Sequence, residues 1–147
     1  MYEQIGRIVD QKLAAEDHVA LTELVAELAW RQDHRDVDGL FELLAPDPQI
    51  CTSAGSYNGP AEVRAWCDRL ATLTSVTRHS CSNLRFAAEG PGEASGTVLV
   101  TAYRHTEGTA ESTLPFVVAE YADRYTRTDA GWRLRSRSVH RVFTAEG

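Results

Sequence analysis

Four long segments with the two-residue period of β-strands fill the second half of this 147-residue chain. Short stretches rich in glycine and small or charged residues, typical of hairpin turns, separate these segments from one another. Consecutive long strands joined by short turns form an antiparallel meander, so this half of the chain is expected to build most of one sheet. The four predicted strands span residues 76–88, 94–106, 114–128 and 131–143.

The first half of the chain has the spacing of helices instead. Apolar residues recur at helical intervals from Asp17, the predicted N-cap of a helix, to Leu28. A weaker pattern of the same kind precedes this helix at residues 5–13. Another helix is expected to begin near Pro60, because proline is favoured in the first turn of a helix.

A short helix is expected between the two longer ones, over residues 37–44. Pro46 and Pro48 follow and should end it, because proline removes a backbone donor that a helix needs. Residues 50–52 then predict a short strand, and residues 53–60 predict a loop or hairpin.

Helices in one half of the chain and strands in the other predict an α+β fold. We expect a cone-shaped α+β barrel, in which three or four N-terminal helices pack in a strongly curved, mainly antiparallel sheet. The open end of such a cone can hold a ligand cavity. No linker, repeat or low-complexity segment interrupts the pattern, so residues 1–147 are expected to form a single domain.

The composition argues against several classes of partner. A formal net charge of −6 leaves no basic face for nucleic acid and no polybasic surface for an anionic membrane. The chain has no apolar run long enough to span a bilayer and does not begin with the pattern of a signal peptide, so a cytoplasmic location is expected.

The chain also lacks the usual patterns of cofactor binding. Its three cysteines form no CxxC pair and are expected to be reduced thiols. Its five histidines do not have the HxxxH or HxH spacing of metal ligands, and no glycine-rich phosphate loop occurs. Neither a metal ion nor another cofactor is therefore expected.

One carboxylate and one histidine stand out as candidate catalytic residues. Asp33 lies three residues after Trp30 near the end of a predicted helix, so the two share a face and the carboxylate is expected to be poorly solvated. Poor solvation and the negative end of the helix dipole would both raise the pKa of Asp33. If His79 on the first long strand shares its pocket, the pair can act as general acid and base. Two alternatives stay open: a helix-end aspartate is commonly solvated or capping, and a strand histidine is commonly satisfied by backbone or water.

Further side chains from both halves of the chain can line the same pocket. They would meet there only if the sheet curls around the helices, and ordinary core packing is the alternative for each aromatic ring. The substrate-binding candidates are Trp30, Tyr57, Trp66, Asn83, Tyr103, Phe116 and Tyr121.

The last predicted strand alternates between two kinds of side chain. Trp132, Leu134, Ser136 and Ser138 would occupy one face, and the other would carry Arg133, Arg135, Arg137 and Arg141. The arginine face, with Glu120 and Asp123 from the neighbouring strand, is expected outside the sheet, where it would be solvated or would form a polar dimer interface.

Four motifs, taken in order, resemble one known family. A helix ending in Trp-x-x-Asp-x-x-Asp (30–36) precedes Leu-Phe, and a later helix opens with Gly-Pro-Ala-Glu-Val (59–63). A strand begins Arg-His-x-x-x-Asn (78–83), and Gly-Trp-Arg-Leu-x-x-Arg (131–137) lies near the end. Over residues 17–143 the chain resembles the SnoaL-like branch of the nuclear transport factor 2-like superfamily. The resemblance implies a cone made of a bent antiparallel sheet and three helices, commonly dimeric through the sheet.

Within that superfamily the pattern is most similar to scytalone dehydratase and bile-acid 7-alpha-dehydratase. This resemblance implies that His79 removes a proton next to a carbonyl group or assists departure of a hydroxyl group, while Asp33 orients and charges the imidazole. Two positions differ from scytalone dehydratase, with Gln32 in place of a tyrosine and Tyr121 in place of an asparagine. The second catalytic histidine of that enzyme lies on the next strand, where the nearest candidates are Thr101, Tyr103 and His105.

These observations predict a cofactor-free acid/base enzyme: a dehydratase, isomerase or cyclase acting on a small hydrophobic carbonyl compound such as a polyketide or steroid-like metabolite. A homodimer or higher homo-oligomer is expected. One alternative is a non-catalytic small-molecule-binding or assembly domain of the same fold. Another is epoxide hydrolysis by a water held in an Asp–Arg–Asp network, to which Asp33 with Asp123 or Arg137 could contribute.

Overall fold

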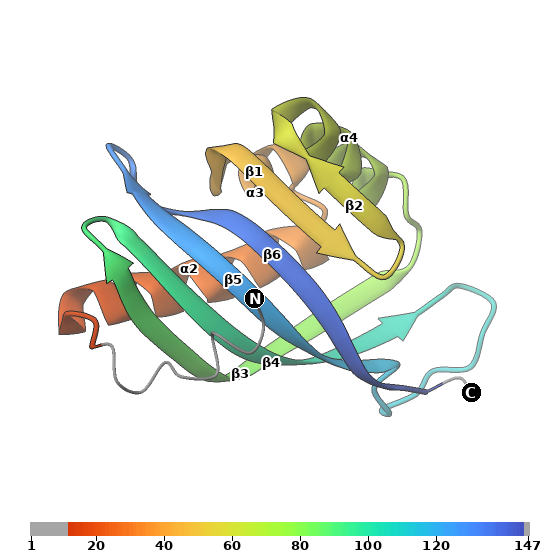
Figure 1. Cartoon of the computed structure of the whole chain (residues 1–147). Coiled ribbons are helices and arrows are strands. Elements are labelled where there is room, and N and C mark those ends of the chain that lie inside the picture. Colours follow the sequence, from red (N-terminus) through yellow and green to blue (C-terminus); the bar gives the residue numbers. More distant parts are fainter. Residues whose placement is uncertain (1–11, 146–147) are drawn as a thin grey trace.

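A six-stranded sheet and three helices make up the described part of the chain, residues 12–145 of a computed structural model (Figure 1). The helices precede or interrupt the sheet in the first half of the chain, and the four longest strands follow one another to its end, as predicted. In chain order the elements are α2 (Ala15–Asp33), α3 (Val37–Glu42), β1 (Leu44–Thr52), β2 (Gly55–Asn58), α4 (Gly59–Ala71), β3 (Val76–Gly90), β4 (Glu93–His105), β5 (Val117–Thr128) and β6 (Gly131–Thr144).

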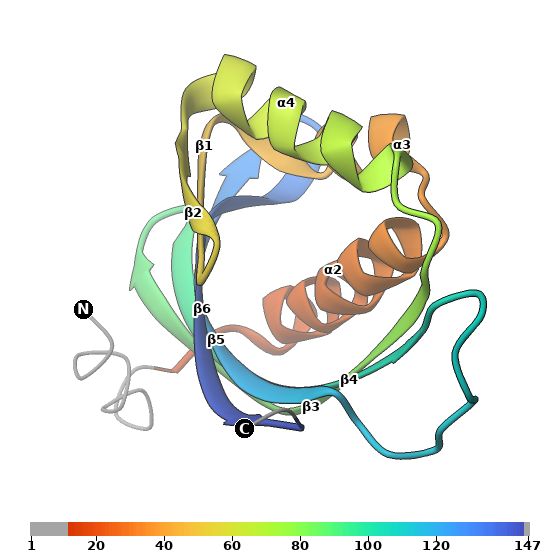
Figure 2. The same cartoon turned by 90° about the vertical axis from the view of Figure 1, so that its right-hand side faces the viewer.

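The sheet has the strand order β2-β1-β6-β5-β4-β3. Strands β3 to β6 form the predicted antiparallel meander, and β1 pairs with β6 in parallel. Figure 2 shows the sheet curving around α2, which lies in the hollow, while α3 and α4 lie over one end. The predicted α+β fold with a strongly curved, mainly antiparallel sheet is confirmed.

Helix α2 buries one apolar face against the hollow side of the sheet. It begins at Ala15, so the prediction that Asp17 is its N-cap was wrong. The carboxylate of Asp17 instead accepts a hydrogen bond from Trp132 Nε1 at 3.0 Å and pairs with Arg127. The carboxylate of Asp17 therefore binds side chains of the sheet and does not cap the helix. The buried face consists of Leu21, Leu24, Val25 and Leu28, and the weak helical pattern predicted at 5–13 lies mostly outside the described residues.

Strand β1 is longer than the predicted strand at 50–52, because it includes both prolines that follow α3. Its pairing with β6 is broken between Leu44 and Gln49. Pro46 and Pro48 lie in this interval, where no regular ladder requires the backbone donors that they lack.

A β-bulge in β6 reverses the predicted faces of that strand. Leu134 pairs with Tyr125 and Ser136 pairs with Arg124, which leaves Arg135 as the extra residue. An extra residue exchanges the faces of all residues that follow, so Arg137 points into the hollow although it follows the outward Arg133 by an even number of positions.

The expectation that Asp123, Arg137 and Arg141 belong to the outer face was therefore wrong. Arg141 lines the same cavity as Arg137, and Asp123 lies with the buried Tyr121 and Tyr125 on the inner face of β5. Arg137 is 8% exposed and its partner Asp123 is fully buried, whereas Arg135 remains exposed.

None of the helices between residues 12 and 145 is both long and apolar enough to cross a bilayer.

Candidate active site

The carboxylate of Asp33, the last residue of α2, is held by β3 through three hydrogen bonds. The Nδ1 atom of His79 lies 2.5 Å from Oδ1, and the backbone N–H of His79 donates to Oδ2 at 2.7 Å. The hydroxyl group of Thr77 donates to Oδ1 at 2.9 Å. The carboxylate can only accept a hydrogen bond, so the proton of a neutral imidazole must lie on Nδ1. Nε2 is then the basic nitrogen of the ring.

The chain reverses direction after α2 in a way that brings the helix end to β3. Arg35 has a left-handed backbone conformation, with φ of 58°. Its guanidinium donates to the carbonyl of Gln32 at 3.0 Å and to the carbonyl of Ser75 at 3.0 Å, and it reaches the hydroxyl of Thr77 at 3.4 Å. These contacts connect the last turn of α2 to the first residues of β3. The Asp33–His79 pair therefore rests on a fixed junction.

The pKa of Asp33 is lowered, so the expectation of a raised pKa was wrong. Burial favours the neutral acid, but the hydrogen bonds from the His79 ring, the His79 backbone and Thr77 together outweigh it. The expected contact with Trp30 also fails to desolvate the group, because Trp30 is 62% exposed and stacks on His34. Asp33 is therefore a permanent carboxylate near neutral pH. A carboxylate in this position can orient the imidazole of His79 and stabilise its protonated form.

The lowered pKa of Asp33 predicts a pH-dependent contribution to stability. A group whose pKa is lower in the folded protein stabilises the fold above its unfolded pKa, which is about 3.9, and loses that contribution as pH falls through the folded value. We expect Asp33→Asn to lower the free energy of unfolding at about pH 5 and to lower it less near pH 3. Urea denaturation at both pH values measures the difference, with Asp129→Asn, at an exposed turn, as the control. A cost for Asp33→Asn that is the same at both pH values would contradict the assignment.

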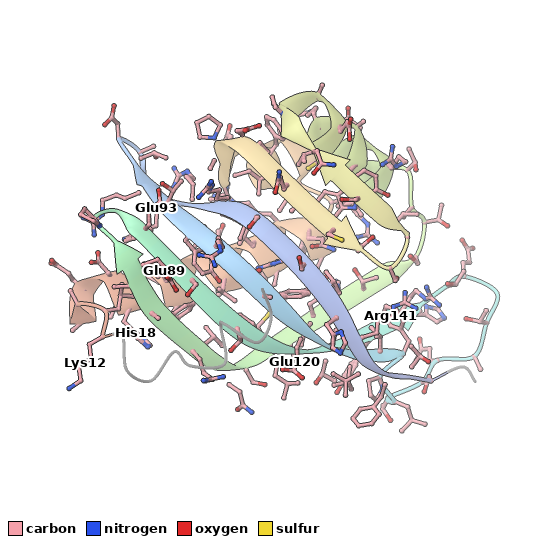
Figure 3. All side chains as sticks on the ribbon, viewed as in Figure 1. Lys12, His18, Glu89, Glu93, Glu120 and Arg141 are labelled. Atoms are coloured by element: carbon pink, nitrogen blue, oxygen red, sulfur yellow. The ribbon has the colours of Figure 1, made fainter. Side chains whose placement is uncertain are left out.

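His79 faces a largely apolar cavity of about 240 Å³ inside the curved sheet. Arg141 lines this cavity and is exposed, so the cavity reaches solvent near the end of β6. Figure 3 places Arg141 at the end of the sheet opposite the labelled Glu89 and Glu93. The apolar walls include Leu28, Leu40, Leu44, Ile50, Val100, Ala119 and Leu134, and the larger polar groups are Gln32, His79, Tyr121, Arg137 and Arg141.

Three of the seven predicted substrate-binding residues, Trp66, Phe116 and Tyr121, line the cavity. Tyr57 lies behind them, with its ring centroid 6.4 Å from that of Trp66.

The other three predicted lining residues lie outside the cavity. Trp30 is on the exposed side of α2, where it lines a separate pocket of about 250 Å³ that Asp33 and His79 also line. Asn83 is exposed at a bulge of β3, with φ of 50°. Tyr103 is on the outer face of β4, because the neighbouring Ala102 faces inward and successive strand residues alternate. His105 lies at the end of β4, where its Nε2 atom contacts the carbonyl of Thr109 at 3.2 Å, and it does not line the cavity.

A second buried polar group, absent from the sequence-based list, lies in the cavity wall. Arg137 Nε and Nη2 donate to Asp123 Oδ1 and Oδ2, each at 2.8 Å. The hydroxyl of Tyr125 donates to Oδ2 at 2.7 Å, and the guanidinium carbon of Arg137 lies 3.9 Å from the centroid of the Tyr121 ring. Sequence reasoning named Asp123 and Arg137 only as alternative members of a water-binding network with Asp33, and placed both on the outer face. Their facing charges on adjacent strands were the signal that could have identified them as a buried pair.

The protonation states of this group are fixed by burial and by the ion pair. Burial opposes the charge of Arg137, but Asp123 raises its pKa above the ordinary value, so the guanidinium stays charged. Burial raises the pKa of Tyr121 to about 12, against the opposing effect of Arg137, so Tyr121 is a neutral phenol. Burial likewise raises the pKa of Cys81, which argues against a thiolate nucleophile there. Within residues 12–145 no three His, Cys, Asp or Glu side chains gather in a way that could hold a metal ion.

The fold and the site define a class of α+β proteins in which one curved sheet encloses an apolar cavity with a hydrogen-bonded His–Asp pair at its wall. Residues 13–138 match the SnoaL-like domain, and the protein belongs to this family. Curated proteins provide no significant match to the sequence.

Solved structures with the same fold are similar over nearly the whole chain. A candidate scytalone dehydratase from Novosphingobium aromaticivorans superposes with a TM-score of 0.79 at 15% identity, covering 91% of this chain and 92% of that one. An NTF2-like protein with a cystatin-like fold from the same organism gives 0.69 at 24% identity, with 90% and 84% covered. A protein of unknown function from Nostoc punctiforme gives 0.75 at 23% identity, with 89% and 95% covered. Identities this low support the fold and leave activity to be argued from the site.

Proposed function

We propose that this protein is a cofactor-free acid/base enzyme, a lyase or isomerase, in which His79 is the proton-transferring residue. One observation carries the proposal: the imidazole that lines the cavity has its Nδ1 atom fixed 2.5 Å from the carboxylate of Asp33. In this arrangement the basic Nε2 atom of the ring points away from Asp33. The carboxylate of Asp33 then stabilises the imidazolium that forms when Nε2 takes a proton.

In the proposed reaction, Nε2 of His79 takes a proton from a carbon next to a carbonyl group of the substrate. The electron pair of the broken C–H bond moves into the carbonyl group and forms an enolate, while Asp33 stabilises the imidazolium. The imidazolium then returns its proton. Return to another carbon gives isomerisation, and return to a departing hydroxyl group gives water and an unsaturated carbonyl compound. Attack of the enolate carbon on a second carbonyl group, followed by protonation of the new alkoxide, gives cyclisation.

The cavity favours a compact hydrophobic substrate. Its volume of about 240 Å³ is small for a ligand pocket, and most of its lining side chains are apolar. A compact carbonyl compound that exposes few polar groups suits such walls. The similarity to a candidate scytalone dehydratase supports dehydration among the three outcomes.

Exchange of carbon-bound hydrogen in deuterated water tests the step that all three outcomes share. We expect the wild-type protein to accelerate exchange next to the carbonyl group of 2-tetralone, measured by NMR, beyond the rate in the same buffer with free imidazole. Binding of the ketone in the cavity is first established from changes in the chemical shifts of the protein. Binding without any acceleration of exchange would favour a non-catalytic binding domain.

We further propose a homodimer, in line with the polar outer face of the sheet, where Arg135 is exposed. Sedimentation equilibrium of the full chain measures the oligomeric state, and a monomer at micromolar concentration would contradict this proposal.

A further inference from the structure

The buried pair of Arg137 and Asp123 leaves part of the guanidinium available to a ligand. An arginine side chain has five N–H donors, and the side-on pair through Nε and Nη2 directs two of them at Asp123. No acceptor for Nη1 is found among the described residues. Arg137 nonetheless lines the cavity, and three of its five N–H donors are not directed at Asp123.

The surrounding residues fix this guanidinium in position. Asp123 is fully buried and accepts from Arg137 twice and from Tyr125 once, which holds one edge of the group. The ring of Tyr121 supports its face at 3.9 Å. A donor held this rigidly needs little reorganisation when it meets a negative charge.

The apolar lining of the cavity makes the remaining N–H donors of Arg137 important for a charged ligand. Most lining side chains are aliphatic or aromatic, so an anionic oxygen placed there would lose its hydration. A charged donor compensates for that loss far better than a neutral one. Arg137 and His79 line the same cavity from β6 and β3, so both can contact one ligand.

We propose that Arg137 binds an anionic oxygen on an apolar ligand, either an enolate or a carboxylate. On the proposed function, to which this inference adds a binding residue, the oxygen is the one that becomes negative when His79 removes the proton. The preferred ligands are then mainly apolar monoanions.

Binding of three naphthalene probes tests this inference without any chemical step. Naphthalene reports the apolar cavity, 2-naphtholate imitates an enolate, and 2-naphthoate represents a carboxylate. The anion of 2-naphthol absorbs at longer wavelength than the neutral form, so its binding is read from the absorption spectrum at a pH where both forms are present.

The variant for this test is Asp123→Asn with Arg137→Gln, which removes both charges together and leaves neither buried alone. We expect the wild-type protein to bind 2-naphtholate more tightly than naphthalene. The double variant should lose about tenfold or more of the affinity for 2-naphtholate and keep its affinity for naphthalene. An equal loss for 2-naphthoate would identify any anionic oxygen as the ligand, and a loss confined to 2-naphtholate would identify the enolate.

Three results would overturn the inference: unchanged 2-naphtholate affinity in the double variant, a parallel loss of naphthalene affinity, or a wild-type protein that binds neither anion more tightly than naphthalene. The outcome is independent of catalysis. His79→Ala should retain the preference for 2-naphtholate while losing hydrogen exchange, so failure of one proposal does not imply failure of the other.

Discussion

Replacing His79 with alanine is expected to slow hydrogen exchange on a bound ketone by about 10²- to 10⁴-fold, the usual contribution of a general base. The substitution removes the proton acceptor from the cavity wall but leaves Asp33 two of its three hydrogen bonds, from the His79 backbone and from Thr77. We therefore expect a folded protein with an intact cavity. Exchange is followed by NMR at saturating ketone, so that the loss appears in the rate of the bound complex.

A chemical rescue separates the catalytic role of His79 from a structural one. Truncation opens space beside Asp33 that free imidazole can enter from the cavity, so added imidazole should restore part of the lost rate. The control is His105→Ala, since His105 lies outside the cavity and should leave exchange unchanged. Equal losses from the two substitutions, or full activity of His79→Ala, would refute the assignment.

Replacing Arg137 with alanine is expected to destabilise the fold by about 3–5 kcal/mol, the usual cost of breaking a buried pair. Most of this cost arises because the carboxylate of Asp123 stays buried without its charged partner, and less of it arises from the lost contact itself. Asp123 is fully buried and would keep only the hydroxyl of Tyr125 as a donor. Urea denaturation at neutral pH measures the loss.

The double substitution Asp123→Asn with Arg137→Gln serves as the matched comparison. It removes the charges together, so we expect it to cost clearly less than Arg137→Ala alone, with a large coupling free energy between the two sites. If the double variant were as unstable as the sum of its single variants, the two residues would not act as one buried unit.

Much of the fold followed from the sequence because its patterns are local. The connections from β3 to β4 and from β5 to β6 are the predicted hairpin turns, and the helix that begins near Pro60 has its proline in the first turn. Between β4 and β5 the predicted short turn was wrong, because residues 106–116 form a longer loop and β5 begins at Val117 instead of 114. The length of β1 could not be obtained in this way. Its prolines suggest a break, and only the irregular pairing with β6 shows why a strand tolerates them.

The candidate site was partly accessible to sequence reasoning for a different reason. Asp33 and His79 were found as a pair, but the pKa direction was wrong because it depends on three donors that β3 supplies from 44 and 46 positions away. Arg137 was misplaced because a single extra residue, Arg135, changes the phase of a strand. Neither a distant donor nor a bulge produces a periodic signal.

The buried pair of Arg137 and Asp123 has a consequence for the charge balance of the reaction. With a neutral His79, the groups at and beside the cavity wall include two guanidiniums, Arg137 and Arg141, and two carboxylates, Asp33 and Asp123, and thus carry no net charge. A proton moved from the substrate to His79 leaves the total unchanged, so nothing charged need cross the apolar walls during the step. Release of an anionic product would leave the proton on His79, whereas release of a neutral product returns the site to its starting charge. The electrostatics therefore favour reactions that give back the proton they take.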